Sequence, residues 1–407
     1  MTRPTHCDLS AGVEVDDAAR TITFRLIRPD PAFLYKLALP NAVAVPPDTG
    51  MVPLRRTLPA TGPYMIAGLS ARGPLRLARN PRFRPVDGRP DGYPDAITID
   101  CCADPERALR AVQQGRADVV GGDFGLDPSL ARQLDAIATR FASRLHTTPV
   151  PVTRFAFLNT HVPPFDDLDV RRALNYAVDR RAFAAVVGGE RYAQATCQFL
   201  PPSFPGYRPY CPYTAAAGVG RRSFVPDLAR ARRLIARSHT RGMRVTVLTG
   251  RPLTDADARP LVTLLDRLGY RARLRVLPER VDYYRYIADS RHRAQIGPAG
   301  WLSDYPAASG YLTLFRCDAF VPADSLQSNF SEFCDRSADR IARRASHMAA
   351  GDTRADELWA QVDKRVTDQA AVLPLINPKA VFLVSRRAGN FQYSQQRGVL
   401  YDQLWLH

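Results

Sequence analysis

One short stretch of the chain holds side chains that could act together in catalysis. Ser303 and Asp304 are neighbours, and His292 lies shortly before them. Adjacent positions do not establish the geometry of a catalytic triad, however, and His292 fits a surface position equally well. The sequence contains neither a Gly-x-Ser-x-Gly elbow nor a phosphate-binding Gly-x-x-x-x-Gly-Lys loop. We therefore expect no enzyme, and a hydrolase remains the third of three alternatives.

The seven cysteines favour disulfides over a metal or redox site. They form no Cys-x-x-Cys pair and accompany no His-x-x-x-His or His-Glu-x-x-His pattern, so we expect neither a metal nor a cofactor. Cys197 and Cys211 bracket a Pro-rich loop, and Cys317 and Cys334 bracket another. A disulfide that closes a loop of this size contributes about 3 kcal/mol and is typical of an oxidising compartment. The alternative is that these are buried thiols.

The charge balance is strongly basic but spread along the chain. Lys and Arg number 56 against 40 Asp and Glu, which gives a formal net charge of +16 over 407 residues. Such a charge could indicate nucleic acid or an acidic surface as partner. Only three residues are lysines, the arginines extend from Arg3 to Arg397, and no base-stacking aromatic motif accompanies them. We expect no nucleic-acid partner, because such an arginine bias more often reflects the coding composition of a genome.

The apolar segments predict a globular protein without a transmembrane segment. With 45% apolar residues the chain can bury one large or several ordinary cores, and no apolar run approaches the roughly 18 residues of a spanning helix. The opening MTRPTHCDLSAGVEVDD contains acids and no apolar h-region, so we expect no signal peptide in this chain.

The first part of the chain predicts strands, turns and one well-marked helix. TITFRL from Thr21 alternates as a strand does and leads into turn-forming residues. Asp104 can cap a helix that has Pro105 in its first position and ends at Gly115. From Asp167, the run DLDVRRALNYAVDRRAFAAVV has helical periodicity. These patterns predict an α/β protein.

The second part alternates helices with strands. The predicted order is a helix over 226–238, a strand from Met243, a helix over 261–268, a strand from Arg271, a helix over 283–288 and a strand leading to Trp301. This alternation predicts a mainly parallel sheet with helices on both faces. The apolar stretch from Ala371 predicts a return to a sheet, and the prolines and apolar strand of 148–160 mark the expected domain boundary.

The stretch from Arg154 to Val187 resembles the solute-binding proteins of peptide and nickel ABC importers, extracellular solute-binding family 5. The family pattern is an apolar strand, Asn, a turn with Pro-Phe-Asp, and a helix reading Val-Arg-x-Ala-Leu-x-x-Ala-x-Asp-Arg. The matching residues are Asn159, Pro164, Phe165, Asp166, Val170, Arg171, Ala173, Leu174, Ala177, Asp179 and Arg180. Further matches run from TGPYMI at Thr61 to GWLSDYPAASGYL at Gly300, so the resemblance covers nearly the whole chain.

The resemblance implies a two-lobed periplasmic-binding-protein-like (class II) fold with mixed sheets, which closes on its solute by a hinge motion. Family members usually begin with an export signal and roughly a hundred further residues, so we expect a shortened first lobe. The expected division is 1–150 for the remnant of the first lobe, 151–372 for the second lobe and 373–407 for strands that return to the first.

The resemblance also assigns a binding site. In peptide-binding relatives an Asp of the Gly-Trp-x-x-Asp-Tyr segment accepts hydrogen bonds from the α-ammonium of the peptide, and Trp301, Asp304 and Tyr305 match that segment. The alternatives are that Asp304 caps a turn and that Trp301 is a wall or core residue.

Three further residues are weaker candidates for ligand contacts. Asn159 could reach the ligand backbone or could hold a turn. Arg291 and His292 resemble residues that pair with the peptide carboxylate in some relatives, and a solvated loop is the alternative for both. Related dipeptide binders also close a loop like that between Cys317 and Cys334 with a disulfide.

The function that the resemblance implies is capture of a short peptide or similar small solute between two lobes and its transfer to ABC permease subunits. The expected location is extracytoplasmic, either periplasmic or at the cell surface. The second alternative is a regulatory ligand sensor with the same fold that acts on a signalling partner.

Overall fold

The computed structural model describes residues 10–46, 57–68, 73–85, 91–100, 104–122, 133, 135–215, 224–349 and 351–407. Cys7 therefore lies outside the described residues. The chain divides into two compact units. Unit 1 comprises Met1–Ala38, Thr153–Asp179 and Thr196–Leu375, and unit 2 comprises Leu39–Val152, Arg180–Ala195 and Ile376–His407. The chain thus passes between the units several times. Two of these passages lie within strands, at 152–153 and at 375–376.

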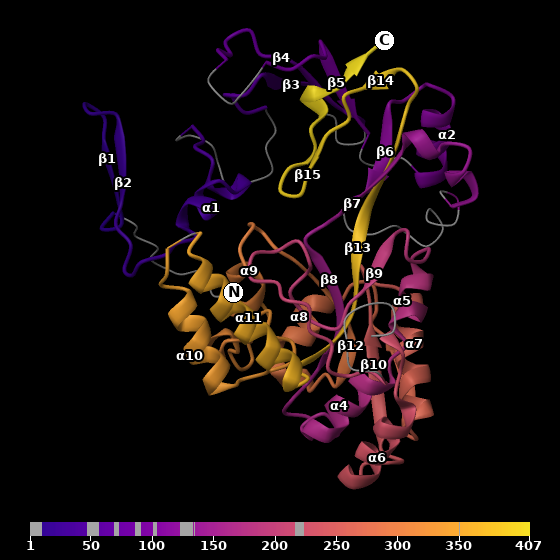
Figure 1. The fold of residues 1–407 in the computed structure, drawn as a ribbon. Coiled ribbons are helices and arrows are strands. Elements are labelled where there is room, and N and C mark those ends of the chain that lie inside the picture. The colour runs from indigo at the N-terminus through magenta and orange to yellow at the C-terminus, as the bar shows by residue number, and fades with distance from the viewer. Residues whose placement is uncertain are drawn as a thin grey trace. The chain divides into compact units, whose positions relative to one another are not determined.

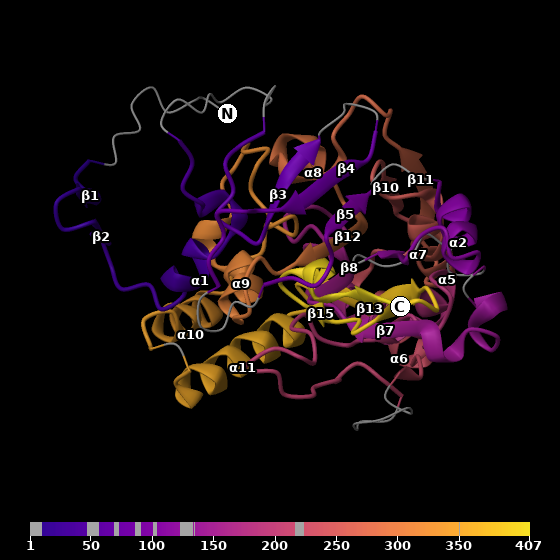
Figure 2. The same cartoon turned by 90° about the horizontal axis from the view of Figure 1, so that it is seen from above.

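Unit 1 is built on a sheet with the strand order β11-β10-β12-β8-β13, of which Figure 1 labels β10, β12, β8 and β13 and Figure 2 labels β11. Both β11 and β12 are parallel to β10, as the alternation of strands and helices predicts. The bounds of the strands are β8 Val152–Leu158, β10 Arg244–Thr249, β11 Arg271–Val276, β12 Ile296–Leu302 and β13 Val372–Val384.

Five helices of unit 1 begin at an aspartate that caps them. Asp167, Asp227, Asp282, Asp335 and Asp352 each accept a hydrogen bond from a backbone N–H of the first turn of the helix that follows. The bounds of these helices and of two others in the unit are α4 Leu168–Ala177, α6 Leu228–Ser238, α7 Asp255–Arg267, α8 Tyr283–Ala288, α9 Ser309–Leu312, α10 Arg336–Ala345 and α11 Thr353–Asp368. Short 3-10 turns lie at Ser290–His292, Thr313–Phe315 and Cys317–Ala319.

The core of unit 1 is rich in aromatic side chains. Phe199 packs edge-to-face on Phe155, Tyr311 and Phe315, with ring centroids 4.7 to 5.6 Å apart. Tyr283 of α8 is fully buried and donates to the backbone oxygen of Pro298 at 2.8 Å. Helix α8 is thereby fixed to β12, the strand that leads to the Trp301 segment.

The opening segment of unit 1 is far less buried. It consists of β1 Val13–Asp16, β2 Thr21–Phe24 and α1 Phe33–Leu37. The 3-10 turn Pro40–Ala42 that follows belongs to unit 2. The strand predicted from Thr21 is confirmed. Among the described residues the two strands pair only with each other, and neither contains a buried residue.

Unit 2 contains a three-stranded antiparallel sheet and a second group of strands around β13. The sheet is β3 Tyr64–Gly68, β4 Leu75–Arg79 and β5 Ala96–Ile99. Antiparallel partners of β13 are β6 Val119–Gly122, β7 Leu145–Pro149 and β9 Ala193–Ala195. The remaining elements are α2 Pro105–Gln113, a 3-10 turn Ala142–Arg144, α5 Arg180–Val186, β14 Ala388–Gly389, β15 Tyr393–Ser394, β16 Gly398–Val399, a 3-10 turn Tyr401–Gln403 and β17 Trp405–Leu406.

Helix α2 confirms the predicted cap, since the Asp104 carboxylate accepts from the backbone N–H of Arg107 at 2.9 Å. The run from Asp167 differs from the prediction, because it forms two helices, α4 and α5. Val178 between them has the extended backbone angles φ −68° and ψ 129°, which end α4. The break falls where the chain passes from unit 1 to unit 2.

Among the helices of the described ranges, none is long and apolar enough to cross a membrane. The division into lobes at 150 and 372 stays a prediction. The two units differ from it in two segments: residues 1–38 belong to unit 1, and residues 180–195 belong to unit 2.

Candidate functional site

The motif that carries most of the sequence resemblance lies in the interior of unit 1 and at its boundary. Asn159 is 1% exposed, and its side-chain amide donates to the Glu332 carboxylate at 2.8 Å while its oxygen accepts from the His161 backbone N–H. Arg171 donates to the backbone oxygens of Phe165 and Gln369. Burial lowers the pKa of Arg171 to about 10. These contacts hold turns and strands together, and a ligand role for Asn159 stays a prediction.

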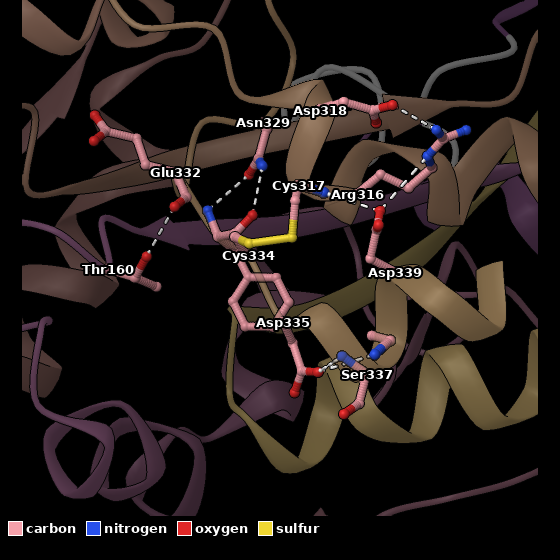
Figure 3. Close-up of a disulfide and its surroundings, with 12 residues drawn as sticks. Thr160, Arg316, Cys317, Asp318, Asn329, Glu332, Cys334, Asp335, Ser337 and Asp339 are labelled. Atoms are coloured by element: carbon pink, nitrogen blue, oxygen red, sulfur yellow. Dashed lines mark hydrogen bonds and ion pairs between the residues drawn. A yellow bond between two sulfur atoms is a disulfide. The ribbon is translucent and has the colours of Figure 1, made fainter. Parts of the chain in front are cut away.

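Asn159 also anchors the loop that the Cys317–Cys334 disulfide closes. Figure 3 shows this loop. From outside it, Thr160 donates to the backbone oxygen of Glu332 in the loop at 3.1 Å. The Asn329 side chain accepts from the backbone N–H of Phe333 and donates to its oxygen. The second predicted disulfide, Cys197–Cys211, is present as well. Both pairs predicted from their spacing are therefore confirmed.

The Trp301 segment continues β12 beyond its carboxyl end. The Trp301 indole donates to the backbone oxygen of Gly310 at 2.7 Å, and its ring packs against the aromatic core. Ser303 is buried, and its hydroxyl donates to the backbone oxygen of Tyr305 at 2.6 Å. In the turn from Ser303 to Tyr305, the side-chain hydrogen bond is therefore made by Ser303 and not by Asp304.

Asp304, in contrast, is exposed, and within the described part of the chain its carboxylate has no hydrogen bond or ion pair. Tyr305 stacks on Tyr35 with ring centroids 6.3 Å apart and planes 5° apart. Tyr305 also lines a cavity of about 470 Å³ in unit 1, whose walls include Lys36, Arg316 and Trp359. The carboxylate of Asp304 is left available for a ligand.

Two arginines that the sequence analysis did not single out lie at the same edge of the sheet as Asp304. Arg251 follows the carboxyl end of β10, Arg280 follows that of β11, and Asp304 follows that of β12. Because the three strands are parallel neighbours, their carboxyl ends point to one edge, which is where open α/β sheets bind ligands. The pairing of Val247 with Ile296 makes β12 extend four residues past the end of β10. The sequence does not give the strand order, which is what marks both arginines as candidates for this edge.

A groove of about 560 Å³ lies beside the two arginines, and its lining includes Arg251, Glu279, Arg280 and Tyr284 but not Asp304. The hydroxyl of Tyr284 is hydrogen-bonded to the backbone of Gly300, the first residue of the Gly-Trp-x-x-Asp segment. Glu279 lies 3.5 Å from Arg251 and neutralises part of its charge, and Arg280 has no ion pair among the described residues. The edge therefore carries cations over β10 and β11 and a carboxylate over β12.

Arg291 and His292 lie at the opposite end of β12, before its first residue. Arg291 forms a bidentate pair with the buried Asp289 at 2.6 to 3.1 Å, and this pair lowers the pKa of Asp289 to about 2. His292 stacks on Tyr286 with ring centroids 3.8 Å apart. Seven residues of strand span about 20 Å, so one short peptide cannot contact both ends of β12. A ligand role for this pair stays a prediction.

Among the residues that the structure describes, no group of three or more His, Cys, Asp or Glu side chains is arranged to hold a metal ion.

Comparison with known proteins gives a consistent result. The family model described as "Bacterial extracellular solute-binding proteins, family 5 Middle" matches residues 7–320. The "Probable di/tripeptide-binding protein 5" of Pseudomonas aeruginosa is 26% identical over 337 residues, which are 82% of this chain and 59% of the relative. A "Dipeptide-binding protein" of the same species is 23% identical over 94% of this chain and 69% of its own length.

Solved structures of binding proteins have the same fold as this chain. The "Clavulanic acid biosynthesis oligopeptide binding protein 2" is 25% identical with a TM-score of 0.84, over 97% of this chain and 72% of its own. A periplasmic binding protein of Helicobacter pylori, solved with the peptide STSA, has a TM-score of 0.73 at 18% identity over 97% and 74% of the two chains. The chain spans 59% of the length of the di/tripeptide-binding relative.

Proposed function

Because this chain belongs to the bacterial extracellular solute-binding proteins of family 5 and has their periplasmic-binding-protein fold, we propose that it captures a short peptide or similar small solute and presents it to the permease subunits of an ABC importer. The family consists of solute-binding proteins. The names of the relatives, which refer to dipeptides, tripeptides and oligopeptides, support a peptide as the solute.

The observation that carries the proposal is the separation of charge at the carboxyl edge of β11, β10 and β12. Val247 of β10 is in register with Leu274 of β11 and Ile296 of β12, so β12 runs four residues, about 13 Å, beyond the ends of β10 and β11. With about 10 Å across the two strand spacings, the ends of β11 and β12 are about 16 Å apart. A peptide of four or five residues spans about 13 to 18 Å. Asp304 would receive the α-ammonium and Arg251 or Arg280 the carboxylate, with the ligand backbone between them.

The proposed location is extracytoplasmic, in the periplasm or at the cell surface. The two disulfides, Cys197–Cys211 and Cys317–Cys334, support an oxidising compartment.

The test is an exchange of Asp304 for Asn, which keeps the size of the side chain and removes its charge. Removal of one partner from a desolvated ion pair costs about 2–5 kcal/mol, so affinity for a free peptide should fall at least about 30-fold. An N-acetylated copy of the peptide should bind the wild type poorly and lose little more on D304N. Calorimetry measures both, with the peptide retained after native purification identified by mass spectrometry.

The matched control is Glu357→Gln on α11, which removes an exposed carboxylate of the same unit far from the Trp301 segment in sequence. It should bind free and acetylated peptides as the wild type does. If D304N binds both as tightly as the wild type, the peptide assignment of this edge fails. This double comparison separates a direct contact from general damage to the loop.

A further inference from the structure

Arginines that are spread along the sequence come together on one strand of unit 1. Arg271, Arg273 and Arg275 occupy alternate positions of β11, and all three are exposed. Alternate residues of a strand point to the same face and lie roughly 6.6 Å apart. Arg244 of β10 is the register partner of Arg271 and extends this face. We call these four residues the arginine face.

The arginine face lies at an outer edge of the sheet. Strand β11 is the last strand in the order β11-β10-β12, and Figure 2 shows it beside β10. Ala272 and Leu274 alternate with the arginines and are partly buried, and α7 packs on the sheet at β10 and β11. Arg273 donates to the Thr246 hydroxyl at 3.3 Å, which confirms that the side chains of this register pair share a face.

The arginine face carries charge without an acidic partner in the part of unit 1 that the structure describes. None of its four arginines forms an ion pair there. The acids that follow β11 in sequence are paired with other arginines: Glu279 with Arg251, Asp282 with Arg285 and Asp289 with Arg291. A row of unpaired guanidinium groups is favourable only beside solvent or beside a partner that carries negative charge.

An aromatic stack continues the face toward α8. The Arg275 guanidinium lies 5.7 Å from the ring centroid of Tyr286, and Tyr286 stacks on His292 at 3.8 Å. The Nδ1 atom of His292 is 2.9 Å from the backbone oxygen of Tyr286, which leaves Nε2 directed away from that contact. The stack therefore gives Arg275 a side-chain contact at the α8 end of the row.

We propose that the arginine face docks unit 1 on the anionic phospholipids of a membrane surface. An open row on a sheet edge presents its charges in a line, which suits a layer of headgroups better than a single small anion. The choice of a membrane over other polyanions rests on the proposed function, since a protein that delivers solute to an importer works beside a bilayer. The association is electrostatic and peripheral, and it uses no spanning helix.

The test is flotation of the whole chain with vesicles of phosphatidylglycerol and phosphatidylcholine, compared with vesicles of phosphatidylcholine alone. The chain should bind only the anionic vesicles, and rising salt should release it. Each arginine near the surface contributes about fivefold to partitioning. The triple variant Arg271→Gln, Arg273→Gln, Arg275→Gln should therefore bind roughly 100-fold less.

Two control variants separate position from total charge and from folding. Arg336→Gln, Arg340→Gln, Arg344→Gln removes the same charge from exposed positions of α10 and should lose less than about fivefold. Arg271→Lys, Arg273→Lys, Arg275→Lys keeps the charge and should bind nearly as the wild type does. Circular dichroism of each variant reports whether it is folded.

Equal losses in the α10 and β11 variants would mean that net charge alone acts, and would overturn the proposal. Failure of the wild type to bind anionic vesicles, or equal retention on heparin and on those vesicles, would also overturn it. The Gln variant of β11 should bind solute with unchanged affinity in calorimetry. Vesicle binding therefore tests the membrane proposal, and solute binding in calorimetry tests the peptide site independently.

Discussion

Asp363 of α11 is a carboxylate enclosed by unit 1. It is 2% exposed, and it accepts hydrogen bonds from the Gln198 side chain at 2.6 Å and from the backbone N–H groups of Phe199 and Leu200. Burial outweighs these hydrogen bonds and raises the pKa of Asp363 to about 6. The residue holds the start of the Pro-rich loop that the Cys197–Cys211 disulfide closes.

This pKa predicts how stability changes with pH. Between about pH 4 and pH 6 the native state holds a proton on Asp363 that the unfolded chain has released, so the free energy of unfolding falls as pH rises through that window. The contribution of this residue should fall by roughly 3 kcal/mol. Urea unfolding of the wild type and of Asp363→Asn at pH 4 to 7 measures it, as the difference between the two proteins. A difference that stays constant over this range would contradict the assignment.

Single residues of the proposed binding site are predictable only in part. A sequence pattern marks Asp304 and Trp301 as candidates, and their role as ligand contacts stays a prediction, whereas Ser303, their neighbour, makes the hydrogen bond of the turn. Arg251 and Arg280 have no local pattern. Their place at the same edge of the sheet as Asp304 depends on the strand order β11-β10-β12, which joins strands that are far apart in sequence.

At the scale of elements, the predictions that succeeded rest on local signals. The Asp104 cap with Pro105 determined the start of α2, and alternating apolar residues indicated β10 and β11. The predicted single helix from Asp167 was wrong because its apolar periodicity continues across Val178. The break comes from the passage of the chain between two units, and periodicity does not report it.

The loop between Cys317 and Cys334 is held by more than its disulfide. Thr160 donates to the backbone oxygen of Ser331 at 3.0 Å, and the Cys317 backbone N–H donates to the Asp339 carboxylate at 3.2 Å. Arg316 pairs with Asp318 in the same region (Figure 3). The loop therefore has tertiary contacts at both ends.

We expect Cys317→Ser, Cys334→Ser to lower the free energy of unfolding by about 2–4 kcal/mol, because the unfolded chain regains the entropy of an open loop. The additional contacts of the loop should keep the variant folded. Urea unfolding measures the change, and peptide mapping without reduction verifies the bond in the wild type. Free thiols at both positions in oxidised protein, or an unchanged unfolding curve, would contradict this prediction.

At the scale of the whole molecule, burial is distributed unevenly. The core of unit 1 includes fully buried Phe157, Phe199 and Tyr311, whereas every residue of β2 is exposed and only Val13 of β1 is partly covered. An isolated two-stranded sheet is marginally stable in water. Backbone hydrogen bonds of the β1–β2 pair should therefore open far more often than those of β8, β10 and β12.

Hydrogen exchange followed by mass spectrometry should resolve this difference. Peptides that cover residues 13–24 should exchange fastest, those of β8, β10 and β12 slowest, and the sheet β3-β4-β5 should lie between. The order follows from how many strands and buried side chains surround each hydrogen bond. Slow exchange across residues 13–24, equal to that of β10, would show that burial does not control protection here.

The assignment of residues after Leu375 to unit 2 affects how the protein forms during translation. The ribosome releases the chain from its amino end, at roughly 5–20 residues per second. All segments of unit 1 have been synthesised when Leu375 emerges, but unit 2 still lacks Ile376 to Val384, the part of β13 that pairs with β6, β7 and β9. These three strands have no central partner until residues 376 to 384 emerge. All segments of unit 1 are therefore available before those of unit 2.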